Sequence, residues 1–318
     1  MPELPELEVV CEVLRRRVVG QTIAAVTLIQ PGAAIVVRDL TASQFDVALT
    51  GATIEGVRRR GKFVIFVLQI ARNGHLHRAA DAVQVLPNPL QSDGHSHPLR
   101  GRSAVFGNPS GANYRYLVLN PKLSGRLQLA APREKKLPKT HVLCALSNDL
   151  ELRYLDQKTM GQLYLTADLA QVPDYASLGP EPFDVSLDQF RERLRPYRGE
   201  IKGVLIRGEF IAGVGNAYAD EILWAARLHP YRKRTALTPD EIDRLYDALQ
   251  STLRDAVDHV RAEMGEAIHR EPRDFMAIHL KSGQPCPRCG TAISQVSANQ
   301  RLTNFCRTCQ PGGLIKGM

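Results

Sequence analysis

The chain begins Met1-Pro2-Glu3-Leu4-Pro5-Glu6, and this stretch combines a reactive terminus with the start of a helix. We expect the initiator methionine to be removed before a small residue, which would leave Pro2 with a free secondary amine. Because an α-amino group has a pKa of about 8, part of it is unprotonated and nucleophilic near neutral pH. Glu3 would place a carboxyl group beside that amine, an arrangement suited to covalent catalysis with proton transfer. The same residues also suit a plain helix start, with Pro5 in the first turn and Glu6 near the positive end of the helix dipole.

The composition indicates a protein with an anionic partner. The 318 residues carry a formal net charge of +8, and the pI is about 9.3. Such a charge favours nucleic acid, although a merely basic enzyme would share it. The region 286–318 contains no Asp or Glu, and further basic clusters lie at 58–62 and 133–136. No segment approaches the ~20 apolar residues of a membrane span. The acidic N-terminus is unlike a signal peptide, so the expected location is cytoplasmic, with no membrane partner.

Hydrophobic periodicity predicts a β-rich domain over residues 1–170 that starts with a helix. Leu7, Val10 and Leu14 recur at helical spacing between residues 6 and 19. Short segments rich in Val, Ile, Leu and Tyr follow, and their spacing indicates a β-sandwich or a β-barrel. They lie at 22–29, 53–57, 63–70, 114–119, 126–129, 141–146, 150–155 and 162–165. Residues 71–113 interrupt this pattern with Gly, Pro, Ser, Asn and His, and we interpret them as a surface insertion rather than a metal site.

The second half of the sequence predicts a linker at 171–184 and a helical domain at 185–282. Capping boxes at Ser186-x-x-Gln189 and Thr238-Pro239-x-Glu241 open two helices. Between them, Gly213-Val214-Gly215-Asn216 leads into an apolar helix at 217–228. Its backbone amides could cradle a phosphate, with Asn216 capping the helix. An ordinary tight turn explains this short motif equally well.

The last segment, 283–318, contains two Cys-x-x-Cys pairs separated by 16 residues. This spacing is typical of a zinc ribbon, and four thiolate ligands make a closed, structural site. We therefore expect one structural zinc ion per chain, bound by Cys286, Cys289, Cys306 and Cys309. Cys11 and Cys144 lie in apolar stretches and are expected to be buried thiols.

Taken in order, these motifs resemble the bacterial formamidopyrimidine-DNA glycosylase and endonuclease VIII family. The resemblance covers nearly the whole chain outside 71–113, and further matching motifs are Arg59-Arg60-Gly61-Lys62, Leu178-Gly179-Pro180-Glu181-Pro182 and Gln300-Arg301. It implies an α+β multidomain fold: a β-sandwich with an N-terminal helix, a helix–two-turns–helix domain and a four-cysteine zinc ribbon. It also implies a monomeric DNA glycosylase with AP lyase activity, acting on double-stranded DNA that contains damaged bases or abasic sites.

The same resemblance implies roles for individual residues. Pro2 would attack the sugar of the damaged nucleotide and form an iminium, while Glu3 would transfer protons. Lys62 would contact phosphate and assist strand cleavage, and Arg301 would grip the phosphates around the lesion. Leu123 and Met160 would be apolar wedges, although both could equally be core residues. Further DNA contacts are implied by alignment for Lys139, Lys158, Arg198 and Asn216.

The loop Asp156–Gly161 departs from the family pattern. It reads Asp156-Gln157-Lys158-Thr159-Met160-Gly161, where the enzymes for oxidised purines carry Asp-Pro-Arg-Arg-Phe-Gly. Lys158 keeps a positive charge but loses the bidentate fork of arginine. Oxidised purines such as formamidopyrimidines remain the expected substrates. The alternatives are an endonuclease VIII-like enzyme for oxidised pyrimidines and a non-catalytic zinc-ribbon protein that binds damaged DNA. Intact Pro2, Glu3 and Lys62 favour an enzyme.

Overall fold

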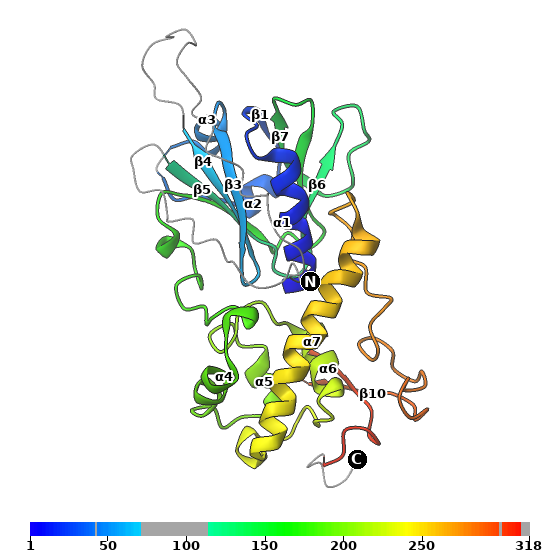
Figure 1. The fold of residues 1–318 in the computed structure, drawn as a ribbon. Helices are drawn as coiled ribbons and strands as arrows, with labels where there is room; N and C mark the ends of the chain where they lie inside the picture. The colour runs from blue at the N-terminus through cyan, green and yellow to red at the C-terminus, as the bar shows by residue number, and fades with distance from the viewer. Residues whose placement is uncertain (42, 71–113, 299–300, 313–318) are drawn as a thin grey trace, which may run out of the picture.

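The computed structural model describes residues 1–41, 43–70, 114–298 and 301–312, so the expected insertion at 71–113 lies outside the described residues. The described chain forms two bodies, which Figure 1 shows one above the other. The upper body is rich in strands, and the lower body contains helices and a C-terminal hairpin. The N-terminus lies at the boundary between them, where helix α1 (Leu4–Val18) begins.

The upper body contains two sheets that share one hydrophobic core with α1. One sheet has the strand order β1-β7-β8-β6 and the other has the order β2-β9-β5-β4-β3. Each predicted strand segment is confirmed, and one further short strand is added. The strands are β1 (Ile23–Leu28), β2 (Val37–Asp39), β3 (Thr53–Arg60), β4 (Phe63–Gln69), β5 (Tyr114–Asn120), β6 (Gly125–Ala130), β7 (Thr140–Leu146), β8 (Glu151–Asp156) and β9 (Gln162–Thr166).

Strand β4 packs on both faces, and one of these faces contacts the linker. Its even-numbered apolar residues face the core shared by the two sheets, as Val64 and Phe66 do. Its odd-numbered residues Phe63 and Ile65 belong to a second cluster, on the opposite face, that includes side chains of the segment 169–178. Because both faces are covered, β4 is apolar along most of its length rather than alternating.

The described part of the lower body contains four α-helices, and the starts of α4 (Leu187–Leu194) and α7 (Pro239–Met264) follow the sequence signals closely. The other two are α5 (Ile201–Leu205) and α6 (Asn216–Ala225). Both predicted capping boxes are present, at the starts of α4 and α7. The apolar face of α7 is buried and packs against α1 and α6. The upper and lower bodies therefore share a continuous core along α1 and α7.

Short elements complete the chain. Helices α2 (Gly32–Val36) and α3 (Phe45–Leu49) flank β2, and 3₁₀ turns lie at Leu169–Gln171, Pro182–Asp184 and Arg234–Ala236. The C-terminal hairpin pairs β10 (Ser294–Ala298) with β11 (Arg301–Phe305). No helix among the described residues combines the length and apolar character needed to cross a bilayer.

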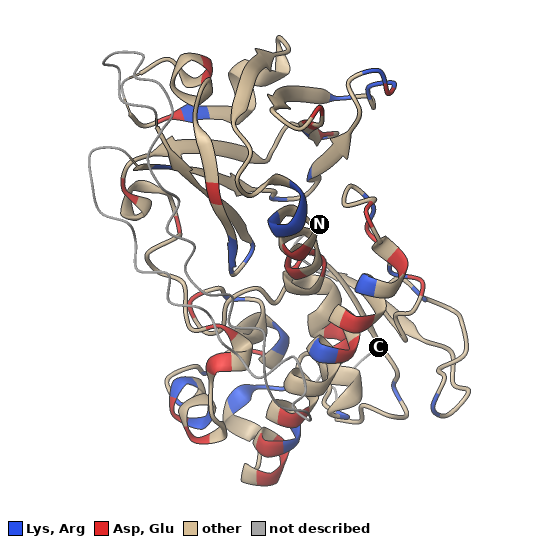
Figure 2. Cartoon of the chain, turned by 45° about the horizontal axis from the view of Figure 1, so that its top comes forward, with Lys and Arg blue, Asp and Glu red and all other residues tan. Residues whose placement is uncertain are grey.

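An ion-pair cluster fixes the linker to the tip of the β3–β4 hairpin, which is basic (Figure 2). The carboxylate of Glu181 accepts hydrogen bonds from Arg59 at 2.5 Å, Arg60 at 2.9 Å and the amide of Gly61 at 2.6 Å. Burial works to raise the pKa of Glu181, but Arg59 and the other donors outweigh it, so that the pKa is lowered. The hairpin tip that carries Lys62 is thereby held against the linker.

Candidate functional site

Glu3 joins the first helix of the chain to the start of α6. Its buried carboxylate accepts hydrogen bonds from the backbone amides of Gly215, Ala217 and Tyr218, at 2.7, 3.0 and 3.4 Å. Amides in the first turn of a helix have no partner within the helix, and the helix dipole favours a negative charge there. The expected cap from Asn216 is wrong, and the three amides that could have bound a phosphate bind Glu3 instead. Gly215 is the N-cap residue, and the anion at this helix start is Glu3 itself.

Gly215 also brings Lys62 next to Glu3. A Cβ atom built on Gly215 would lie 2.3 Å from Glu3 Cδ and 2.6 Å from Lys62 Nζ. Both side chains therefore approach the same face of this glycine, and any larger residue would displace one of them. The structure thus brings together Glu3 and Lys62, two of the residues expected from the sequence to act in catalysis.

Asn216 has a different partner from the one expected. Its Nδ2 donates a 2.7 Å hydrogen bond to the carbonyl oxygen of Leu302, in strand β11 of the C-terminal hairpin. Arg301 precedes Leu302 at the end of the hairpin, and its backbone pairs with Ala298. Asn216 therefore connects the start of α6 to the hairpin segment that carries Arg301, whose side chain lies outside the described residues.

A buried polar network below this contact was not found from the sequence. Asp220 of α6 pairs with Lys202 Nζ at 2.6 Å and with His279 Nδ1 at 2.8 Å. Lys202 also donates to Thr303 Oγ1 at 2.9 Å, and the amide of Asn304 donates to Asp220 at 3.1 Å. The network fixes β11 against α5 and α6. The signal for it was present in the acidic pair 220–221 inside an apolar helix, since buried charges need partners.

The four cysteines of the C-terminal motif come together as expected. One Sγ atom from each of Cys286, Cys289, Cys306 and Cys309 lies within 4.8 Å of the others. Tetrahedral zinc with sulfur at about 2.3 Å requires sulfur atoms roughly 4 Å apart, so the cluster fits one structural zinc ion. Cys11 and Cys144 are buried in the upper body, as predicted.

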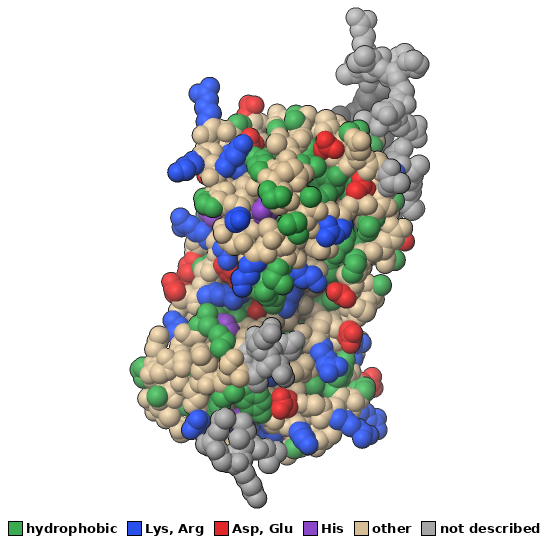
Figure 3. Space-filling model, turned by 180° about the vertical axis from the view of Figure 1, so that it is seen from behind, with side chains coloured by type: hydrophobic (Ala, Val, Ile, Leu, Met, Phe, Trp, Pro, Cys, Tyr) green, Lys and Arg blue, Asp and Glu red, His purple; other side chains and the backbone are tan. Residues whose placement is uncertain are grey.

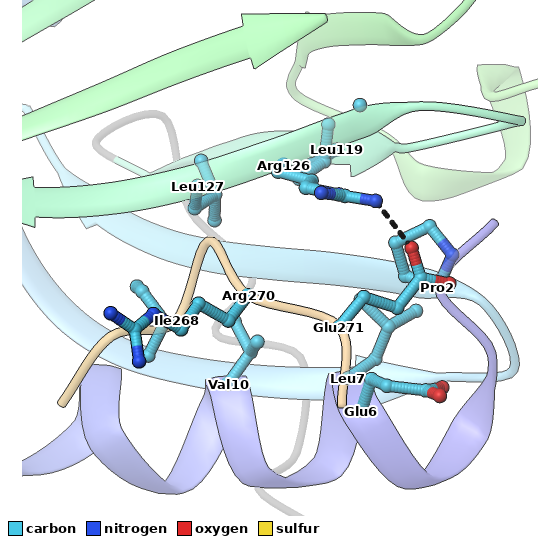
Figure 4. A pocket seen from close by; sticks show the side chains of 11 residues that line it. Pro2, Glu6, Leu7, Val10, Leu119, Arg126, Leu127, Ile268, Arg270 and Glu271 are labelled. Atoms are coloured by element: carbon cyan, nitrogen blue, oxygen red, sulfur yellow. Dashed lines mark hydrogen bonds and ion pairs between the residues drawn. The ribbon is translucent and has the colours of Figure 1, made fainter. Parts of the chain in front are cut away.

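A second group of charges surrounds the N-terminus. The ammonium of Met1 lies 3.0 Å from Glu271 Oε1, and Glu271 also pairs with Arg126 at 2.5 Å and Arg273 at 2.8 Å. Arg273 in turn contacts Glu6, whose pKa is raised by burial despite this arginine. Figure 4 shows Arg126 reaching Glu271 beside the ring of Pro2, around a small cavity. The resemblance indicated that the stretch 270–281 is shorter than the family loop that covers oxidised guanine, but it assigned no role to Glu271 or Arg273 themselves.

The two expected wedge residues lie at the surface. Leu123 is 42% exposed and Met160 is 50% exposed, which excludes the alternative that they are core residues. Buried Asp156 ties their loops together, because it accepts hydrogen bonds from Ser124 Oγ and from the amides of Lys158 and Gly161. The side chain of Lys158 is exposed beside Met160.

An open cleft of about 590 Å³ lies between the two bodies. Its lining includes Met1, Lys62, Asn120, Lys122 and Arg207. Figure 3 shows basic side chains interspersed with apolar ones where the upper and lower bodies meet. Lys139, before β7, and Arg198, before α5, are both exposed but do not belong to the described lining of the cleft.

Models of three protein domain families match the chain in sequence. Residues 1–163 match the formamidopyrimidine-DNA glycosylase N-terminal domain, and residues 178–266 match the helix–two-turns–helix domain of the same enzymes. Residues 283–312 match the zinc finger found in FPG and IleRS. Similar proteins include a formamidopyrimidine-DNA glycosylase of Symbiobacterium thermophilum, 31% identical over 98% of this chain and 90% of its own. Another from Bacillus cereus is 30% identical, with 98% and 99% of the two chains covered.

Solved structures show the same likeness. Formamidopyrimidine-DNA glycosylase of Lactococcus lactis, non-covalently bound to DNA with an abasic site, superposes with a TM-score of 0.72 and 28% identity. A second complex, with DNA that contains carbocyclic 8-oxo-G, superposes with a TM-score of 0.74 and 28% identity. Each comparison covers 98% of this chain and all of the other.

Proposed function

Because the chain belongs to the formamidopyrimidine-DNA glycosylase family, we propose that it is a base-excision-repair enzyme that removes oxidised purines from double-stranded DNA. It then cleaves the strand at the abasic site that remains. The observation that carries this proposal is the juxtaposition of buried Glu3 with Lys62 at Gly215, because Lys62 and Met1 both line the cleft. We further infer that the enzyme acts as a monomer in the bacterial cytoplasm.

The cleft is suited to hold a bent strand with one nucleotide turned out. A base within the duplex is unreachable, and flipping it out costs a few kcal/mol. Leu123 and Met160, exposed on loops joined through Asp156, would fill the gap that the base leaves. Lys62 and Arg301 would contact the flanking phosphates, and the altered loop leaves a single cation, Lys158, beside Met160.

The chemistry would use the amine of Pro2 once Met1 has been removed. The nitrogen lone pair attacks C1′ of the sugar, and the bond from C1′ to the base breaks with its electron pair on the departing base. The sugar ring then opens to give an iminium, with Glu3 transferring protons at the sugar. Loss of a proton from C2′ expels the 3′ phosphate, which cleaves the strand. Water finally releases the amine from the sugar.

The zinc ion would contribute to binding rather than to these steps. Four cysteine ligands leave no open position for a substrate. The hairpin that follows the first cysteine pair contacts α6 through Asn216 and Asp220, so it would place Arg301 on the same side as Glu3.

Borohydride trapping tests the proposed function. The full-length protein, shown by mass to lack Met1, is incubated with DNA that carries a preformed abasic site and with borohydride. Reduction of the iminium should give a stable covalent complex, with the DNA mapped to Pro2. An uncleaved N-terminal extension removes the free amine and should abolish trapping, while zinc content and DNA affinity persist.

Two results would contradict the proposal in different ways. Tight binding to abasic DNA without trapping would indicate a non-catalytic DNA-binding protein. Trapping at an internal lysine would retain the lyase but exclude Pro2 as its nucleophile.

A further inference from the structure

The segment after α7 returns to the N-terminus and surrounds it with charge. Glu271 and Arg273 in this segment contact the first residue of the chain: Glu271 pairs with the ammonium of Met1, and Arg273 donates to its carbonyl oxygen at 2.7 Å. Arg126 of β6 reaches the same carboxylate from the upper body. The side chain of Glu271 is only 10% exposed, so these ion pairs are largely shielded from water.

We propose that Glu271 holds the terminal amine of the processed chain in position for attack on the sugar, and that Arg126 and Arg273 orient this carboxylate. The inference rests on the proposed function, because it concerns the amine of Pro2. Glu271 is thus a positioning residue that acts through Pro2.

The geometry allows the pairing to survive removal of Met1. Consecutive Cα atoms are about 3.8 Å apart, so removal of one residue shifts the terminal charge by a similar distance. Pro2 already lines the same small cavity as Glu271, Arg126 and Arg270 (Figure 4). The amine of Pro2 would therefore remain near the carboxylate that binds the ammonium of Met1.

The ion pairs of Glu271 with Arg126, Arg273 and the terminal ammonium keep its carboxylate charged and in place. Burial acts to raise the pKa of Glu271, but Arg273, the terminal ammonium and Arg126 outweigh it and lower the pKa. Arg273 is held in turn by Glu6 at 3.1 Å and lies over the ring of Tyr218. The charged groups that face Glu271 are the ammonium of Met1, Arg126 of β6, Arg273 of its own segment and Glu6 of α1. Arg273 in turn is surrounded by Glu3, Glu6 and Tyr218 of α6, and Arg270 lines the same cavity as Glu271.

Replacing Glu271 by Gln would remove the carboxylate that pairs with the terminal ammonium, while Arg126 and Arg273 remain nearby. The amine should then lose its proton more readily, so its reaction should begin at lower pH. The maximal rate should fall, because the amide does not hold the amine by charge. A purely structural role for Glu271 predicts a lower rate at every pH, with no displacement of the profile.

The test measures the initial rate of borohydride trapping on preformed abasic DNA between pH 5.5 and 9. The buffer is strong enough that added borohydride does not change the pH, and the borohydride concentration is the same at every pH. In Glu271→Gln, half-maximal trapping should move about one unit to lower pH, and the plateau should fall several-fold. Glu271→Asp keeps the charge and should retain the wild-type midpoint. Glu266→Gln is the matched control, because Glu266 lies in the same segment but pairs with exposed Arg16 and Arg17. It should follow the wild type.

The outcomes separate this inference from the proposed function. If the wild type fails to trap, or traps at an internal lysine, the proposed function fails and the inference fails with it. If the wild type traps at Pro2 but the Glu271→Gln midpoint does not move, only the inference is overturned. Should Glu271→Gln not fold, judged by zinc content and thermal melting, Glu271→Asp decides: a midpoint displaced to lower pH would contradict a role carried by charge.

Discussion

The carboxylate of Glu3 accepts a 2.7 Å hydrogen bond from the amide of Gly215, 212 positions later in the chain. Neither body alone can form this contact, because Glu3 begins α1 and Gly215 precedes α6. The group expected to transfer protons is therefore in place only when the two bodies are docked. The contact of Glu3 with the start of α6 forms only when the upper and lower bodies pack together.

Gly215→Ala should reduce both base excision and abasic-site cleavage by about 100-fold or more. The new Cβ would overlap Glu3 or Lys62, and a displacement of about 1 Å in a catalytic group can cost a factor of that size. Single-turnover strand nicking measures the effect. Gly203→Ala is the control, because no atom lies within 4 Å of the added methyl group and alanine favours the helix. Wild-type rates for Gly215→Ala would show that the crowding is relieved elsewhere.

Glu3→Gln should impair base excision more than cleavage of a preformed abasic site. The amide oxygen can replace only one of the two carboxylate oxygens, so either Gly215 or Ala217 loses its acceptor, and thermal melting must confirm that the fold persists. Removing the base requires proton transfer at the sugar, whereas a preformed abasic site has no base to expel. The two activities are compared on oligonucleotides of the same sequence. Equal losses in both would assign Glu3 a purely structural role.

Changing Leu123 and Met160 together to Ala should slow excision from duplex DNA by roughly tenfold, with a much smaller effect on single strands. Turning a base out of a duplex costs a few kcal/mol, and a wedge offsets part of that cost. Since both side chains are exposed, the thermal stability should change little. Val47→Ala, at another exposed apolar residue, serves as the control. Equal losses on both substrates would exclude the wedge role.

Removing zinc should weaken DNA binding roughly tenfold or more while leaving the upper body folded. The cysteine cluster fixes the base of the hairpin, and without metal no bond joins the two cysteine pairs. Cys289→Ser and a chelator should have the same effect on binding to an abasic-site duplex, measured by fluorescence anisotropy. Added zinc should restore only the chelated protein. A metal-free protein with unchanged affinity would show that the hairpin is held by Asp220 and Asn216 alone.

Glu181→Gln should lower stability at neutral pH by about 3 kcal/mol, since it leaves buried Arg59 without one of its partners. The pKa of Glu181 is lowered in the folded state, so its contribution is present above the unfolded pKa of about 4.5 and is lost as pH falls through the folded pKa. The difference between wild type and variant should therefore shrink below pH 4.5. Denaturant unfolding at several pH values measures it. Exposed Glu263→Gln should show no such trend.

Local patterns in the sequence predicted the strands and the longer helices well. Val64 and Phe66 of β4, and the capping boxes before α4 and α7, carry information within a few residues. Helix α3 and strand β2 escaped prediction because three to five residues are too few to reveal a period.

Contacts between distant residues were predicted less well. Nothing near Glu3 in sequence indicates that amides more than 200 residues later will bind it, and the family resemblance named the residue without its partners. Glu271 and Arg273 are ordinary surface charges by sequence alone, because their partners are Met1, Glu6 and Arg126. Only the folded arrangement distinguishes them.

The long reach of the first residues has a consequence for synthesis on the ribosome. Met1, Glu3 and Glu6 emerge first, but their partners at 215–218 and 271–273 are translated more than 200 residues later. Until then the terminus of the nascent chain has none of these contacts and is accessible for removal of Met1. A chain that is released early, before residue 215, would lack the helix start that binds Glu3, so the cell would not be exposed to a truncated product with an assembled site for cutting DNA.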